Sequence, residues 1–119
     1  MDTVISQAEF AIAGSEKIEN FPKKTWQFDI LRKIPELKGK INFSNAHIFY
    51  NKLAKFAKKL PPDTELFLHT SGISGNTFCV ASMKVIDEEL LKKGGRLVVT
   101  DLGNILKDVM ILNGVKRFL

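Results

Sequence analysis

Apolar and polar positions alternate in two stretches near the start of the readable pattern. Alternation from Trp26 to Ile34 has the period of a half-buried strand, and Pro35 is expected to end it because proline cannot donate to a strand ladder. A second alternation predicts a hairpin-like or continued strand over residues 37–43. Two later runs, Glu65–His69 and Arg96–Thr100, are short and apolar, and the second is expected to be buried on both faces, between layers of helices.

Three longer segments carry apolar residues at helical spacing instead. Their expected buried stripes are Phe49, Leu53, Phe56 and Leu60; Phe78, Ala81, Val85, Ile86 and Leu90; and Ile105, Leu106, Val109, Met110 and Leu112. Ser44-Asn45 and Asn76 supply the side chains that favour helix starts. Pro61-Pro62, Gly94-Gly95 and Asn113-Gly114 are expected to end the three helices.

The order of elements is therefore strands, helix, strand, helix, strand, helix. Strands joined through helices favour parallel pairing with crossover connections. The pattern predicts an α/β fold in which helices pack against a small sheet. Residues 26–119 are expected to form this one domain, and residues 1–25 an N-terminal extension or an extra strand.

Composition narrows the functional classes. The chain of 119 residues has a net charge of +5 and one cysteine, Cys79, so no internal disulfide is expected and a reducing, cytoplasmic location is favoured. No apolar run is long enough to span a membrane, and no signal peptide is recognisable. Two histidines and one cysteine give no basis for a metal site, and no cofactor is expected. The lysines lack an aromatic-interleaved pattern, so a nucleic-acid partner is not expected.

Two segments carry a family resemblance that covers about residues 28–119. They are Gly39-Lys-Ile-Asn-Phe-Ser-Asn-Ala46, and Gly94-Gly95-Arg-Leu-Val-Val followed by a turn, a helix and Leu112-Asn113-Gly114-Val115. Together they resemble the STAS domain (sulfate transporter and anti-sigma factor antagonist). The resemblance implies a small mixed sheet with helices packed on it. It also implies a cytoplasmic, non-enzymatic regulator whose partner is another protein, either an anti-sigma factor or kinase-like regulator or a component of a transport system.

The resemblance also points to a functional loop, and here the chain departs from the family. The family's Asp-Ser-Ser-Gly phosphorylation motif falls on Asn76-Thr77-Phe78-Cys79. Phenylalanine cannot accept a phosphate, so the usual switch is expected to be lost in a divergent member. Ser74 and Thr77 are the remaining hydroxyls for phosphorylation, or else they cap the helix. The expected partner-binding or switch residues are Ser74, Asn76, Thr77, Phe78, Cys79 and Ser82.

Two other functional classes remain open. The loop before the predicted helix at Asn76 offers Ser71, Gly72, Gly75 and Thr77 as a backbone cradle for an anion or nucleotide, although it lacks the lysine and spacing of a P-loop. Catalysis by Cys79, His69 or Asp101 is the weaker class, because no catalytic pair is recognisable, and the protein is predicted not to be an enzyme. An unpaired edge strand also leaves homodimerisation open.

Overall fold

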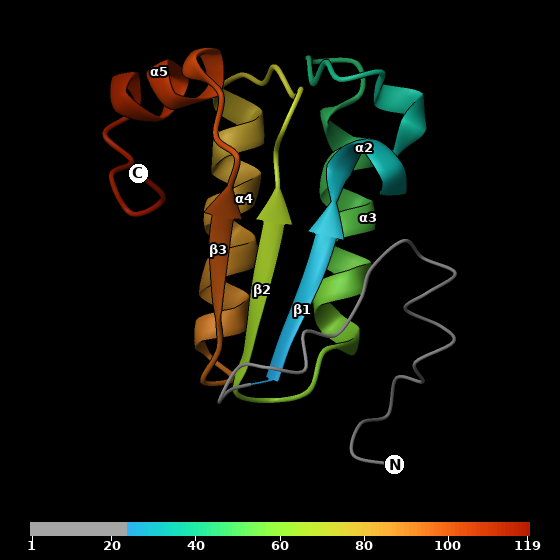
Figure 1. Ribbon diagram of the computed structural model, residues 1–119, viewed down its shortest axis with the longest axis vertical. Helices are drawn as coiled ribbons and strands as arrows, with labels where there is room; N and C mark the ends of the chain where they lie inside the picture. The colour runs from blue at the N-terminus through green and yellow to red at the C-terminus, as the bar shows by residue number, and fades with distance from the viewer. Residues whose placement is uncertain (1–23) are drawn as a thin grey trace.

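Three strands lie side by side in the order β1, β2, β3, and both pairings are parallel (Figure 1). They are Lys24–Asp29 (β1), Thr64–His69 (β2) and Arg96–Thr100 (β3). This computed structural model describes residues 24–119. In the register, Trp26 lies opposite Leu66 and Leu66 opposite Leu97, so these three side chains project from one face of the sheet.

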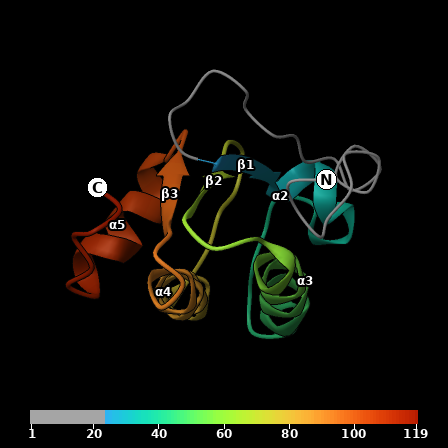
Figure 2. The same cartoon turned by 90° about the horizontal axis from the view of Figure 1, so that it is seen from below.

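Two long helices cover that face. The helices are Ile30–Lys33 (α2), Ala46–Lys59 (α3), Thr77–Leu91 (α4) and Asn104–Leu112 (α5), with a short 3-10 helix at Pro35–Leu37 (η1). Seen along the strands, α3 and α4 lie together on one side of the sheet, and α5 lies beside β3 and α4 (Figure 2). Each of the two crossovers, β1 to β2 and β2 to β3, therefore contributes one helix to the same layer.

The core lies between this helical layer and the sheet. Its largest fully buried side chains include Trp26, Phe28, Phe49, Leu53, Leu66, Leu68 and Met83. The predicted α/β class, with helices packed on a small sheet in a single domain, is confirmed. Because every strand pair within residues 24–119 is parallel, an antiparallel strand of the expected mixed sheet is not part of this region.

The first strand is shorter than the alternation predicts. It ends at Asp29, whose carboxylate accepts a hydrogen bond from the backbone N–H of Arg32 at 3.2 Å and so begins α2. The prediction of a strand over residues 37–43 is wrong. After η1, Lys38 adopts a positive φ of 52°, and only an isolated bridge between Lys40 and Ser74 continues the pairing.

The prediction that β3 is buried on both faces is also wrong. It is an edge strand of the described sheet, with Leu97 buried and Val98 half-buried. The outward N–H of Leu97 donates to Oδ1 of Asp87 at 2.9 Å, and Nε of Arg117 lies 2.5 Å from Oδ2. Asp87, a charged residue outside the expected apolar stripe of α4, is therefore buried, and it joins α4, β3 and the C-terminal segment.

Two sequence predictions concern the ends and the environment of the chain. Of the expected N-terminal extension or extra strand, Lys24 and Thr25 belong to β1, and residues 1–23 lie outside the described residues. No helix within residues 24–119 combines the length and apolar character needed to cross a bilayer.

Candidate functional site

The loop that precedes α4 is fastened to the segment that precedes α3. Ser74 donates its backbone N–H to the carbonyl of Gly39 at 2.7 Å, and Ile41 donates to the carbonyl of Ser74 at 2.8 Å. Gly39 is needed here, because it has a φ of +82° and a Cβ would come within 2.8 Å of the Gly72 carbonyl oxygen. The two segments thus hold the N-terminal ends of α3 and α4 at one end of the molecule (Figure 1).

The start of α4 is capped as its sequence predicts. Oδ1 of Asn76 accepts a hydrogen bond from the backbone N–H of Cys79 at 3.1 Å. Thr77 and Phe78 are exposed at the first positions of the helix. Nδ2 of Asn113 lies 3.3 Å from Oγ1 of Thr77, and Oγ of Ser82 donates to the carbonyl of Phe78 at 2.8 Å. The expected contact residues therefore cluster at the surface, except for Cys79.

Cys79 lies beneath this surface. Its side chain is fully buried, and burial raises the pKa of the thiol to about 12. A cysteine at a helix start can have an activated thiolate, but desolvation has the opposite effect here. Cys79 therefore supports the first turn of α4 from inside and does not offer a nucleophile to a ligand.

The exposed side of α4 is more apolar than the periodicity suggested. Phe78, Ala81 and Val85, three members of the expected buried stripe, are exposed, and the exposed fraction of Val85 is 42%. The buried stripe lies elsewhere on the helix, at Cys79, Val80, Met83, Ile86, Asp87 and Leu90. Apolar residues surround most of this helix, so its spacing alone did not identify the inward face. The outward apolar residues need another explanation.

Two phenylalanine rings meet at the surface beside this stripe. Phe43, from the turn before α3, and Phe78, from the first turn of α4, have ring centroids 4.8 Å apart in an edge-to-face arrangement. Their exposed fractions are 81% and 47%. Contiguous exposed apolar patches mark interaction sites, whereas single exposed apolar residues are common. We call these two residues the aromatic pair.

The charged residues along α3 are all lysines. On the far flank of α3, Lys52 pairs with Glu36 at 2.9 Å. The backbone hydrogen bond of Glu36, and then this contact with Lys52, lower the pKa of the Glu36 carboxyl. Partial burial lowers the pKa of Lys33, and the charges of Lys52 and Lys59 add to the effect. These ammonium groups repel one another, so this flank attracts anions.

The residues of the alternative anion cradle are less available than the sequence suggests. Ser71 and Gly72 are exposed, and Gly72 has a φ of +77°. The backbone N–H groups that follow them are engaged, that of Ile73 with the carbonyl of Thr70 at 3.0 Å and that of Ser74 with Gly39. An anion in this loop would have to replace hydrogen bonds within the chain, which costs part of its binding free energy.

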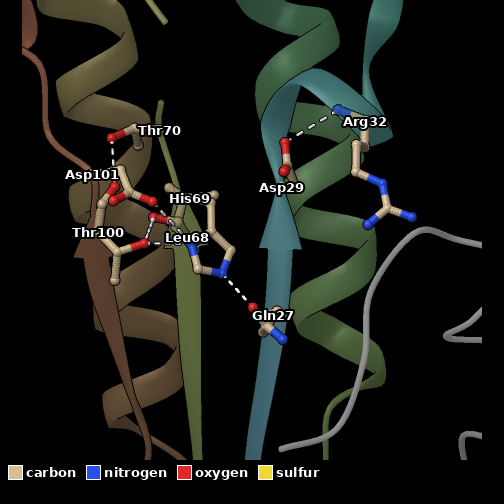
Figure 3. Close-up of polar contacts among 8 residues, drawn as sticks. All are labelled: Gln27, Asp29, Arg32, Leu68, His69, Thr70, Thr100 and Asp101. Atoms are coloured by element: carbon tan, nitrogen blue, oxygen red, sulfur yellow. Dashed lines mark hydrogen bonds and ion pairs between the residues drawn. The ribbon is translucent and has the colours of Figure 1, made fainter. Parts of the chain in front are cut away.

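A polar row crosses the other face of the sheet at the ends of the strands (Figure 3). Nε2 of His69 lies 2.5 Å from Oε1 of Gln27, and Nδ1 lies 2.5 Å from Oγ1 of Thr100. If Nε2 carries the proton, the Thr100 hydroxyl donates to Nδ1, and all three strands are joined through one imidazole. Oδ2 of Asp101, at a positive φ of 56°, lies 3.6 Å from Nδ1.

This row does not combine with Cys79 into a catalytic site. His69 lies on the face of the sheet opposite to α3 and α4, whereas Cys79 belongs to α4 and is buried against the covered face. Within residues 24–119, no group of three or more His, Cys, Asp or Glu side chains could hold a metal ion. The hydrogen bonds of the row give it a structural role, since they connect β1, β2 and β3.

Sequence reasoning missed three residues of these arrangements, Phe43 of the aromatic pair and Gln27 and Thr100 of the polar row. The alternation predicts a strand at Phe43, whereas its neighbours Asn42, Ser44 and Asn45 are typical of turns, and connecting segments lie at the surface. Gln27 and Thr100 could be identified only once the register of the strands was known.

No protein-family model matches the chain, and no curated protein matches it.

Proposed function

We propose that this protein is a non-enzymatic, STAS-like regulator that docks on another protein through the aromatic pair and the exposed start of α4. The observation that carries the proposal is the aromatic pair itself, two touching rings that stay largely exposed. Aromatic residues are enriched among the residues that dominate binding energy at interfaces. The exposed Ala81 and Val85 extend the same apolar surface along α4.

The proposal includes a docking surface without the family's phosphorylation switch. Phe78 stands where the resemblance places the phosphate acceptor, and its ring contacts Phe43. A phosphate introduces about −1.5 to −2 charges into a contact surface and releases a partner. An aromatic residue at that position favours a constitutive contact. The proposed partner is an anti-sigma factor, a kinase-like regulator or a component of a transport system in the cytoplasm.

Affinity capture from native lysate, followed by mass spectrometry, tests this function. Phe43→Asp and Phe78→Asp each place a charge in the aromatic pair, whereas Leu119→Asp places the same charge at an exposed apolar residue near the end of the chain. A stoichiometric partner that both phenylalanine variants lose and Leu119→Asp retains is the expected result. A partner retained by both phenylalanine variants would contradict the proposal. Circular dichroism establishes that all three variants are folded.

The lost switch has its own test. Intact-mass measurement of the protein captured from cells is expected to show no phosphate on Ser74 or Thr77. The backbone of Ser74 is hydrogen-bonded to Gly39, and the hydroxyl of Thr77 contacts Asn113. A stoichiometric phosphate on either residue, with loss of the partner, would show that the switch has moved by a few residues instead of disappearing.

The anion-binding alternative has a different expected outcome. Any ligand that binds only the folded state raises the melting temperature. Because the backbone donors at Ile73 and Ser74 are engaged, phosphate and nucleotides are expected to leave the melting temperature unchanged. A rise that disappears in Ser71→Ala or Thr77→Ala would favour the anion-binding module over the docking protein.

A further inference from the structure

A groove runs between α3 and α4. It has a volume of about 150 Å³, and its floor is apolar, formed by Ala54, Ala57, Ile86 and Leu90. Tyr50, Lys58 and Glu89 line its rim and are exposed, Tyr50 by 36%, so the groove opens to solvent. The sheet lies on the other side of both helices (Figure 2).

Helical spacing connects this groove to the aromatic pair. On α4, Phe78, Ser82 and Ile86 recur every four residues and therefore lie along one flank, which ends beside the groove floor. On α3, Tyr50 and Ala54 have the same spacing. The aromatic pair joins the starts of the two helices, and Ser82 lies between Phe78 and Ile86, the first α4 residue of the groove lining, on the same flank.

The charge around this surface is unbalanced. Two lysines line the groove, Lys58 from α3 and Lys93 just after α4, whereas Lys52, on the far flank of α3, pairs with Glu36. The groove has one carboxylate at its rim, Glu89, which already pairs with Lys92 at 3.1 Å. Nζ of Lys93 donates to the carbonyls of Ala57 and Leu60. A partner that complements this rim carries carboxylates.

We infer that the groove and the aromatic pair together bind an amphipathic helix of the partner protein, with apolar residues along its buried stripe and Asp or Glu on its flanks. This inference rests on the proposed docking function and names its partner class. A helix fits because two neighbouring helices present a long, shallow groove into which a third helix packs its ridges, as in helix-in-groove recognition. Ala54 and Ala57 are small, so they let its backbone approach closely.

The test uses a displayed library of random peptides selected on the complete chain. Peptides of about 15–20 residues are suitable, since at 1.5 Å per residue they match the length of α3 and α4. The selected peptides are expected to have apolar residues at spacings of three and four and an excess of Asp and Glu. Dissociation constants of the labelled peptides are then measured by fluorescence anisotropy.

Two variants with the same change in charge distinguish binding in the groove from general electrostatic attraction between the chain and an acidic peptide. Lys58→Glu reverses a charge at the rim, whereas Lys84→Glu reverses one on α4 away from the groove lining. Lys58→Glu is expected to raise the dissociation constant about tenfold and Lys84→Glu less than about twofold. Ala54→Leu fills the floor and is expected to weaken binding about tenfold without a change in charge.

The possible outcomes separate this inference from the proposed function. The inference is overturned if the selected peptides have no excess of Asp and Glu, or if Lys58→Glu and Lys84→Glu weaken their binding equally. If the chain binds a labelled oligonucleotide and the two lysine variants lose it equally, nucleic-acid binding is indicated instead. If the captured native partner needs Phe43 and Phe78 but tolerates Lys58→Glu and Ala54→Leu, the docking function stands and the groove inference fails. If the partner is indifferent to Phe43→Asp and Phe78→Asp, the docking function fails.

Discussion

At the scale of single residues, burial determines the chemistry of Cys79. Its thiol has a pKa of about 12 in place of 9.0, so the reactive thiolate is a very small fraction of the population at pH 8. We expect the folded protein to react with a thiol reagent at least about a hundredfold more slowly than the protein unfolded in urea. Absorbance of the released thiol dye measures both rates.

An exposed cysteine provides the control for this experiment. Ser71→Cys in a Cys79→Ala background places a thiol at an exposed loop position and should react rapidly in the folded protein. Rapid stoichiometric labelling of Cys79 in the folded protein would contradict the buried position.

The same pKa shift predicts a pH effect, because unfolding releases the thiol to ionise near its usual pKa. Stability should therefore fall as the pH rises above about 9.

At the scale of elements, Asp29 decides where β1 ends and α2 begins. Asp29→Ala removes the acceptor for the N–H of Arg32 and should cost about 1 kcal/mol, whereas Asp29→Asn keeps an oxygen there and should cost less. Urea unfolding of the two variants measures the difference. Equal losses in both variants would show that the hydrogen bond does not determine the boundary.

The link between α4, β3 and the C-terminal segment gives a second element-scale prediction. Asp87→Ala leaves the N–H of Leu97 without its acceptor and Arg117 without its partner, so we expect a loss of about 2–3 kcal/mol in the free energy of unfolding. Glu88→Ala changes an exposed neighbour and should change it by less than about 0.5 kcal/mol. A similar effect of the two substitutions, measured in urea, would contradict the structural role of Asp87.

At the scale of the whole molecule, the sequence predicts the order of elements better than their orientation. Pro61-Pro62, Gly94-Gly95 and Asn76 are strong local signals, and each lies at a helix boundary or just beyond it. The inward face of α4 could not be identified locally, because apolar residues lie on several sides of the helix. It follows from the tertiary position of Asp87, which the edge strand and Arg117 hold inside.

The candidate site shows the same contrast between features that local sequence predicts and features that depend on the tertiary structure. The region around residues 74–82 could be proposed from the chain, but the aromatic pair requires Phe43 and Phe78, which are 35 positions apart and meet only when the turn before α3 reaches α4. The polar row of Gln27, His69 and Thr100 depends in the same way on the parallel register.

That register also has a consequence for how the chain is made. Lys24 pairs with Thr64 and Glu65 with Arg96, so each pairing joins segments about 30–40 residues apart and no tight turn brings neighbouring strands together. During synthesis, β1 therefore leaves the ribosome without a strand to pair with until β2 has followed. Trp26 and Phe28, which are buried in the core of the folded protein, stay exposed during that interval. Until β2 has followed, these side chains of the nascent chain are available to bind chaperones or to aggregate.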